Sequence, residues 1–235
     1  ETEQMGQAAA DFAAAKLKGA IQDTGEANLI LATGASQFAF LDAFKADDSM
    51  EWDKITVFHL DEYIGIDERH KASFRKYLKE RILEEVQPKQ IHLLNGDVDD
   101  IDAEVTRYEN LLKSVQVDVA CIGIGENGHI AFNDPPVADF DDPNLVKVVE
   151  LDEQSRKQQV GEGWFDTMDD VPKQALSLTI PAIMRCSAIS CVVPDERKAD
   201  AVYKTVNDQI STECPATILR QHPDTVLFLD AGSAA

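Results

Sequence analysis

The stretch Val117–Ile124, which reads VDVACIGI, is a short run of mainly apolar residues that ends in a glycine-rich segment. A continuous apolar run of this length is typical of a strand that is buried on both faces of a sheet. Similar runs occur elsewhere in the chain, at residues 27–32, 54–60, 189–193 and 226–229. The sequence therefore predicts five buried strands.

Apolar residues recur at helical spacing between these runs, at residues 5–21, 38–44, 74–85, 101–113 and 196–207. Buried strands that alternate with helices indicate a mainly parallel sheet, because helical crossovers join parallel strands and cover both faces. We therefore predict a three-layer α/β/α fold with a Rossmann-like sheet. No repeat, low-complexity tract or clear linker interrupts the pattern, so we expect residues 1–235 to form a single domain.

Residues 135–152 are the least periodic part of the chain, with three prolines and several acidic residues. This composition predicts a loop. The loop is either a mobile segment over a site or a plain surface connection.

The composition argues against several classes of function. With 43 acidic and 22 basic residues the formal net charge is -21, which disfavours nucleic acid as a partner because phosphates demand a basic face. No apolar run approaches the roughly 18 to 20 residues that cross a bilayer, and residues 1–12 lack the features of a signal peptide. The four cysteines show neither disulfide nor metal spacing, and Cys121 and Cys191 lie within apolar runs. We expect a cytoplasmic protein without membrane contact.

Each candidate motif follows a predicted strand, which is where open α/β sheets bind their ligands. The turn Thr33-Gly34-Ala35-Ser36 leads into a predicted helix, so its backbone N–H groups and the helix N-terminus suit a phosphate. Ordinary helix capping is the alternative explanation of this turn. No Walker lysine and no GxGxxG pattern accompanies it, which disfavours nucleotides.

Two adjacent carboxylates, Asp61 and Glu62, stand where the second predicted strand leaves the core. A carboxylate in a partly dry cleft has a raised pKa and can move a proton beside a carbonyl group. Strand alternation points the two side chains to opposite sides, so only one of them should line a cleft. A helix cap or a surface pair is the alternative.

The segment Gly123–Pro135, which reads GIGENGHIAFNDP, is the most informative in the chain. Its three glycines allow the backbone to approach a ligand closely. Asn127, His129 and Asp134 follow within a few residues, and a histidine oriented by a carboxylate is a natural acid–base group near neutral pH. Of these three side chains, only His129 and Asp134 are common metal ligands, so we do not expect a metal site.

Lys198 follows the strand predicted at residues 189–193, in the first turn of a helix and beside Arg197. Cations at a helix N-terminus oppose the helix dipole, and an anionic ligand would explain their placement. A solvated surface cluster with Asp195 and Glu196 is the alternative.

Together these segments resemble the glucosamine-6-phosphate deaminase family, within a larger group that includes 6-phosphogluconolactonases and ribose-5-phosphate isomerases. The resemblance covers residues 28–230, and its strongest parts are residues 60–65, 70–74, 91–96 and 123–135. Residues 131–135 read Ala-Phe-Asn-Asp-Pro, a continuation of the glycine-histidine core that lactonases lack.

The resemblance implies aldose–ketose isomerisation with deamination of an amino-hexose 6-phosphate, without a metal or organic cofactor. Asp61 matches the base that moves a proton between C2 and C1, and His129 matches the imidazole that assists ring opening. Asn127 falls where members of the family have Asp or Asn. Asp134 falls where they usually have Glu, so the carboxylate is one methylene shorter here.

The resemblance also assigns the phosphate site, with one departure. Thr33, Gly34, Ala35 and Ser36 match the phosphate loop, and Lys198 matches a phosphate-binding lysine. The family's phosphate arginine usually precedes an aromatic pair, whereas here residues 161–163 read Gly-Glu-Gly before Trp164-Phe165. We expect the nearest arginine, Arg156, to take over this contact.

Two other functions stay open at this point. A 6-phosphogluconolactonase would use His129 to activate water and leave Asp61 without a role. A non-catalytic sugar-phosphate sensor is disfavoured, because no DNA-binding segment accompanies the domain. The C4 configuration of the sugar and the formation of a homo-oligomer are not fixed by the sequence.

Overall fold

The computed structural model describes the backbone of all 235 residues and every side chain except that of Gln154. Its main sheet has six strands in the order β4-β2-β1-β5-β8-β9, and all neighbouring strands are parallel. The predicted parallel sheet is therefore confirmed. Its strands are β1 (Ala27–Leu31), β2 (Ile55–His59), β4 (Gln90–His92), β5 (Val119–Ile122), β8 (Ala188–Val193) and β9 (Thr225–Leu229).

Alternate residues of the central strands pack into two separate cores, one on each face of the sheet. Leu29 and Leu31 of β1 belong to one core, while Ile30 between them belongs to the other. The first core is completed by α1 (Thr2–Thr24), α2 (Phe38–Lys45), α3 (Phe74–Leu78) and the π-helix η3 (Lys79–Leu83).

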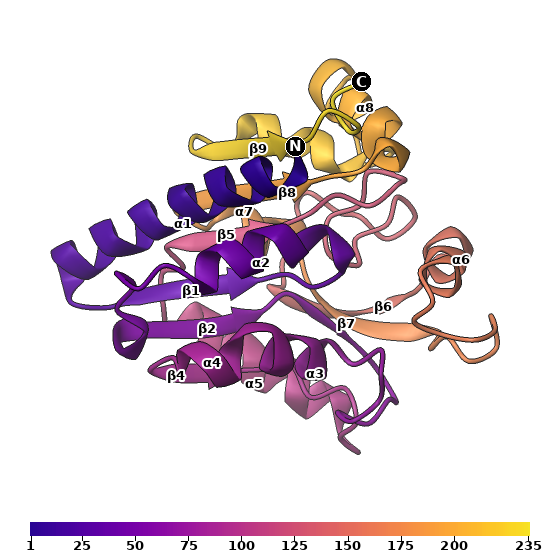
Figure 1. Ribbon diagram of the computed structural model, residues 1–235. Helices are drawn as coiled ribbons and strands as arrows, with labels where there is room; N and C mark the ends of the chain where they lie inside the picture. The colour runs from indigo at the N-terminus through magenta and orange to yellow at the C-terminus, as the bar shows by residue number, and fades with distance from the viewer.

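The second core is completed by helices that come later in the chain, so the sheet lies between two helical layers (Figure 1). These helices are α5 (Ile101–Lys113), α7 (Ile180–Met184), α8 (Ala199–Asn207) and the 3-10 helix η5 (Pro215–Gln221). The three-layer α/β/α prediction is confirmed, and the predicted helices at residues 101–113 and 38–44 end within a residue of the observed ones.

A second, three-stranded antiparallel sheet lies beside the carboxyl ends of the main strands. It has the order β3-β7-β6, with β3 (Asp61–Tyr63), β7 (Gln174–Leu178) and β6 (Val146–Glu150). The β6–β7 pair extends away from the main sheet and carries α6 (Glu153–Gly161) at its far end (Figure 1). A third apolar cluster, which includes Tyr63, Phe132 and Phe165, fills the space around it.

The sequence-based prediction missed this second sheet and strand β4. Strands β3 and β4 have only three residues each, and β3 consists of Asp, Glu and Tyr. In β6 and β7 polar residues interrupt the apolar ones, so none of the four carries the apolar run that signals a buried strand. The loop predicted for residues 135–152 was wrong in its second half, where residues 146–150 form β6. This strand forms because β7 provides an antiparallel partner across its whole length.

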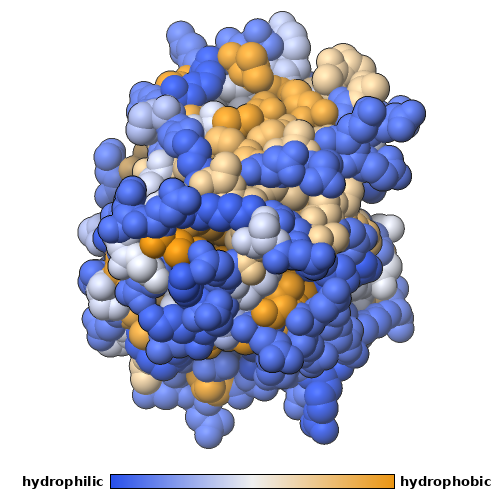
Figure 2. All heavy atoms as spheres, turned by 60° about the vertical axis from the view of Figure 1, so that its left-hand side comes forward, coloured by the Kyte–Doolittle hydropathy of each residue, from blue (hydrophilic) through white to orange (hydrophobic). Residues whose placement is uncertain are grey.

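The surface agrees with the acidic composition. Polar and charged residues cover most of the face drawn in Figure 2, with an apolar area in its upper half. All four cysteines are free and buried, as expected for Cys121 and Cys191. None of the helices that the structure describes is long and apolar enough to cross a membrane.

Candidate active site

A cavity of about 380 Å³ opens beyond the carboxyl ends of the main strands. Its lining includes most of the candidate residues, which come from segments far apart in the sequence: Thr33, Gly34, Ala35, Ser36, Asp61, His129 and Lys198. The loops after β1, β2, β5 and β8 bring these side chains together because all four strands are parallel and end at the same edge. A volume of this size suits a small-molecule ligand.

Asp61 begins β3 immediately after the turn that follows β2. Its side chain lines the cavity although the residue is only 7% exposed. Burial, and to a lesser extent the charge of Glu62, raises the pKa of Asp61 to about 8. The carboxyl group is thus close to the balance between its protonated and ionised forms near neutral pH, which suits a group that takes up and returns a proton.

Two oxygen atoms lie within hydrogen-bond distance of the same ring nitrogen of His129. Its Nδ1 lies 2.7 Å from Oδ1 of Asn127 and 2.8 Å from Oδ1 of Asp134. Because the carboxylate is an acceptor, we assign the proton to Nδ1, which leaves Nε2 available for a ligand in the cavity. Asn127 also donates from Nδ2 to Asp134, at 2.9 Å, so the three side chains form one network.

Asp134 anchors this network from a buried position. Burial alone raises its pKa, but the charge of His129 and hydrogen bonds from His129, Asn127 and Ser155 bring the pKa down to about 2. Ser155 donates to the carboxylate at 2.6 Å. The shorter aspartate therefore still reaches the imidazole, with α6 supplying one of its donors.

Two glycines give the loop before His129 its shape. A Cβ atom on Gly125 would lie 2.1 Å from Cε1 of His129, so the imidazole ring packs directly over this backbone. Gly128 has φ of +81°, and a Cβ atom there would lie 2.4 Å from Sγ of Cys214. A larger residue at Gly125 would displace the ring, and one at Gly128 would clash with Cys214 and strain the backbone, which explains the glycine spacing of this segment.

The turn after β1 forms another part of the cavity wall. Gly34 has φ of +100° and precedes the 3-10 helix η1 (Ala35–Gln37), which leads into α2. The carbonyl oxygen of Gly34 accepts a hydrogen bond of 2.8 Å from the hydroxyl group of Tyr77. The turn thus presents small side chains and backbone to the cavity, as a phosphate loop requires.

Lys198 is the most informative cation in the cavity. The residue is only 7% exposed, and within the part of the chain that the structure describes its ammonium group makes no hydrogen bond or ion pair. Burial lowers its pKa, while the more distant charges of Glu126 and Glu162 act in the opposite direction. An ammonium group that lines the cavity and has no acceptor there is well placed to bind an anionic ligand, which would supply the missing partner.

Arg156 does not join this group, contrary to the expectation from the sequence. Its guanidinium group donates to the carbonyl oxygens of Met168 and Val171, and it is not among the residues that line the cavity. The reason is its place on α6, where it holds the following loop instead of facing the ligand space. The expectation that Arg156 replaces the missing arginine is therefore corrected.

Arg197 and Glu162 line the cavity and were not among the predicted site residues. Arg197 is paired with Asp195 at 2.8 Å and lies 3.9 Å from Glu126. Glu162 accepts hydrogen bonds from Gln158 and Trp164. Adjacency to Lys198 was the only sequence signal for Arg197, and the Gly-Glu-Gly departure was the only signal for Glu162.

The fold and the cavity define the class: an α/β protein with a pocket for a small anionic ligand and with acid–base side chains beside it. The chain belongs to the family of glucosamine-6-phosphate isomerases and 6-phosphogluconolactonases, whose family model matches residues 1–228. The resemblance inferred from the motifs is thereby confirmed.

Relatives that are named glucosamine-6-phosphate deaminase align with most of the chain. A glucosamine-6-phosphate deaminase of Exiguobacterium sp. is 39% identical over 87% of this chain and 78% of its own length. One of Staphylococcus haemolyticus is 34% identical over 94% of this chain and 93% of its own length.

Two solved structures with similar folds differ in their sequence identity to this chain. A monomeric glucosamine-6-phosphate deaminase superposes with a TM-score of 0.91 and 32% identity, over all of this chain and 96% of that one. A 6-phosphogluconolactonase of Shewanella baltica superposes with a TM-score of 0.78 over 98% of this chain and 95% of that one, but at 17% identity. The second likeness shows a shared fold alone.

Proposed function

We propose that the protein converts an amino-hexose 6-phosphate, with glucosamine 6-phosphate as its substrate, to the ketose 6-phosphate and ammonia. The observation that carries this proposal is that three groups line or face one cavity: a carboxyl group whose pKa is raised to about 8, an oriented imidazole, and the ammonium group of Lys198, which has no acceptor among the described residues. The sequence relatives named as glucosamine-6-phosphate deaminases support it. Free, buried cysteines fit a reducing cytoplasm as its location.

The phosphate group binds between Lys198 and the turn at Thr33–Ser36 in this proposal. The ammonium group of Lys198, which has no acceptor among the described residues, contacts the phosphate, and the backbone N–H groups of the turn add neutral donors. Arg197 adds positive charge at the same side of the cavity. The net charge of -21 makes these local cations necessary, since the global field repels an anion.

Ring opening is assigned to His129. Nε2 takes the proton from the O1 hydroxyl group and returns it to O5 as the C1–O5 bond breaks, which gives the open-chain aldehyde. Asp134 and Asn127 keep Nδ1 occupied, so the same ring nitrogen serves as base and acid in turn.

Isomerisation is assigned to Asp61. Its ionised form removes the proton from C2, which the neighbouring aldehyde acidifies. The electron pair forms a C1–C2 double bond as the π pair of the carbonyl group moves to O1, and O1 takes a proton from the substrate's own ammonium group, which gives an enolamine. The protonated Asp61 then returns a proton to C1, which produces the C2 imine. Addition of water to this imine, with loss of ammonia, leaves the ketose; this last step is a hydrolysis.

The proposed function is tested by incubating the purified protein with glucosamine 6-phosphate and measuring ammonia and ketose phosphate. Equal amounts of the two products are expected. A parallel assay with 6-phosphogluconolactone tests the alternative function, which is supported by the family model that covers both activities and by a shared fold at low identity. Lactone hydrolysis without release of ammonia would reject the proposal, and absence of both activities would favour a sugar-phosphate sensor.

Lys198→Ala is expected to raise KM about ten- to a hundredfold with little change in kcat, because a charge-assisted contact contributes about 1.5 to 3 kcal/mol in ground state and transition state alike. Arg156→Ala is the matched control, since Arg156 lies outside the cavity lining. It should lower the melting temperature through loss of its contacts to Met168 and Val171 and leave KM nearly unchanged. Steady-state kinetics that show equal rises in KM for both variants would refute this phosphate site.

A further inference from the structure

Glu62, the neighbour of Asp61, is buried and faces away from the cavity. It is 0% exposed and does not line the cavity, so the two carboxylates point to different sides, as strand alternation predicts. Neither the helix cap nor the surface pair considered from the sequence describes it. Its partner is Arg75, which is only 3% exposed and lies 3.2 Å away through Nε.

The carboxyl group of Glu62 collects donors from both ends of one loop. It accepts from the backbone N–H of Tyr63 at 3.0 Å, of Phe74 at 3.1 Å and of Arg75 at 2.9 Å. It also accepts from the hydroxyl group of Ser73 at 3.1 Å. One side chain on β3 therefore fixes the first turn of α3 and closes the intervening loop.

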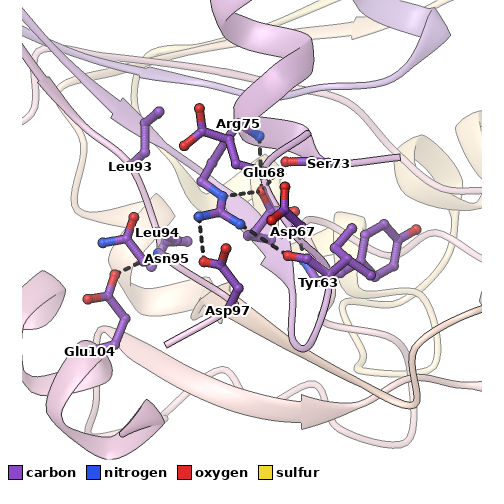
Figure 3. Close-up of polar contacts among 12 residues, drawn as sticks. Tyr63, Asp67, Glu68, Ser73, Arg75, Leu93, Leu94, Asn95, Asp97 and Glu104 are labelled. Atoms are coloured by element: carbon purple, nitrogen blue, oxygen red, sulfur yellow. Dashed lines mark hydrogen bonds and ion pairs between the residues drawn. The ribbon is translucent and has the colours of Figure 1, made fainter. Parts of the chain in front are cut away.

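Arg75 extends the same cluster towards the loop after β4. It donates to Asp97 at 2.7 Å and to the carbonyl oxygen of Ile66 at 3.2 Å. Figure 3 shows Arg75 in the middle of this cluster, with Ser73 and Tyr63 on one side and Asp97 below. The guanidinium group thus links β3, the loop between β3 and α3, and the loop after β4.

The segment that Glu62 fixes also forms part of the cavity wall. Ala72, Ser73, Phe74 and Tyr77 all line the cavity. The hydroxyl group of Tyr77 then reaches across to the carbonyl oxygen of Gly34, at 2.8 Å, in the turn proposed to bind phosphate. A continuous set of contacts therefore runs from the strand of Asp61, through Glu62 and α3, to the turn after β1.

We propose that Glu62 is a positioning residue that sets the distance between the base Asp61 and the phosphate-binding turn at Gly34, acting through α3 and Tyr77. The inference rests on the proposed function, because it takes Asp61 as the base and the turn at Gly34 as the phosphate site. Glu62 keeps these two parts of the site at a fixed separation. A sugar phosphate held at C6 must present C2 to Asp61, so a displacement of either wall by about 1 Å misaligns the reacting atoms and costs up to about a hundredfold in rate.

A purely structural role for the Glu62–Arg75 pair is the competing explanation. Replacing a buried ion pair often costs little stability, whereas leaving one partner unpaired destabilises strongly, so loss of stability alone does not distinguish the two explanations. The distinction requires a property of the cavity, measured at a temperature where the variant is folded.

Glu104 provides the matched control for this measurement. It is also a buried glutamate, 5% exposed, and forms an ion pair with Arg107 at 2.6 Å. It accepts from the backbone N–H of Asn95 at 2.7 Å, and it lies on α5, outside the cavity lining. Glu104→Gln therefore removes a comparable buried charge without touching either wall of the site.

The test compares Glu62→Gln and Glu104→Gln by affinity for inorganic phosphate and by kcat, each measured well below the melting temperature. Glu62→Gln is expected to weaken phosphate binding about fivefold or more and to lower kcat about tenfold or more. Glu104→Gln is expected to lower the melting temperature with neither change. Unaltered phosphate affinity and kcat in folded Glu62→Gln, or equal losses in Glu104→Gln, would overturn the proposal.

Tyr77→Phe keeps the proposal testable if Glu62→Gln does not fold, because it removes only the hydrogen bond to Gly34. It should weaken phosphate binding several-fold and leave the melting temperature within a few degrees; unchanged phosphate affinity would overturn the proposal. The phosphate measurement needs no turnover. A wild-type protein that releases no ammonia would thus reject the proposed function, while the positioning role of Glu62 would still be decided by binding.

Discussion

Asp61→Asn is expected to abolish ammonia release almost completely. The value of kcat should fall by about 10²- to 10⁴-fold, while phosphate and substrate still bind. Asparagine keeps the shape of the side chain but cannot accept the C2 proton. Kinetics with glucosamine 6-phosphate, together with titration of inorganic phosphate, measure both halves of this prediction.

The same substitution should not destabilise the protein. A carboxyl group whose pKa is raised from 3.8 to about 8 on folding costs stability at every pH above its unfolded value, and the cost grows until the pH passes about 8. A neutral side chain removes this cost, so the melting temperature at pH 7 should equal or exceed that of the wild type. Full activity in folded Asp61→Asn would refute the proton-transfer role.

His129→Gln is expected to lower kcat by about 10² or more, the usual scale for an acid–base group, and to leave phosphate affinity nearly intact. The reason is that His129 belongs to the ring-opening half of the cavity, whereas the proposed phosphate contacts come from Lys198 and the turn after β1. The effect appears in kcat and kcat/KM together, as expected for an interaction made in the transition state.

Asp134→Asn is the natural comparison for the histidine variant. Asp134 orients Nδ1 and does not itself carry the transferred proton, so its loss should cost less than the loss of the imidazole. Equal losses in the two variants would show that they act as one coupled unit. Unimpaired turnover in His129→Gln would remove the imidazole from the reaction.

Most of the main sheet could be predicted because its four central strands, β2, β1, β5 and β8, are buried on both faces. Residues such as Leu29, Ile30 and Leu31 must all be apolar when alternate side chains enter different cores, and such runs are visible in a single sequence. Strands β3 and β6 carry polar residues and depend on β7 for pairing, so their formation is decided by tertiary contacts that no local pattern records.

The candidate site could likewise be predicted only in part. The side chains that follow a buried strand, such as Asp61, His129 and Lys198, could be placed together from topology alone. Arg156 was misplaced because its position depends on how α6 packs, and α6 has no marked apolar face. The buried pair of Glu62 and Arg75 was missed because charged residues are expected at the surface unless a partner is seen, and the partner lies 13 residues away.

The proton transfer from C2 to C1 by one carboxyl group is the central claim, and turnover in D₂O tests it most directly. We predict a ketose 6-phosphate with deuterium at C1, on one face of that carbon and at less than one atom per molecule. The label is partial because a buried carboxyl group returns some of the original proton before exchange with solvent. A product formed in D₂O with no deuterium at C1 would contradict the account, since direct hydride transfer from C2 leaves that signature.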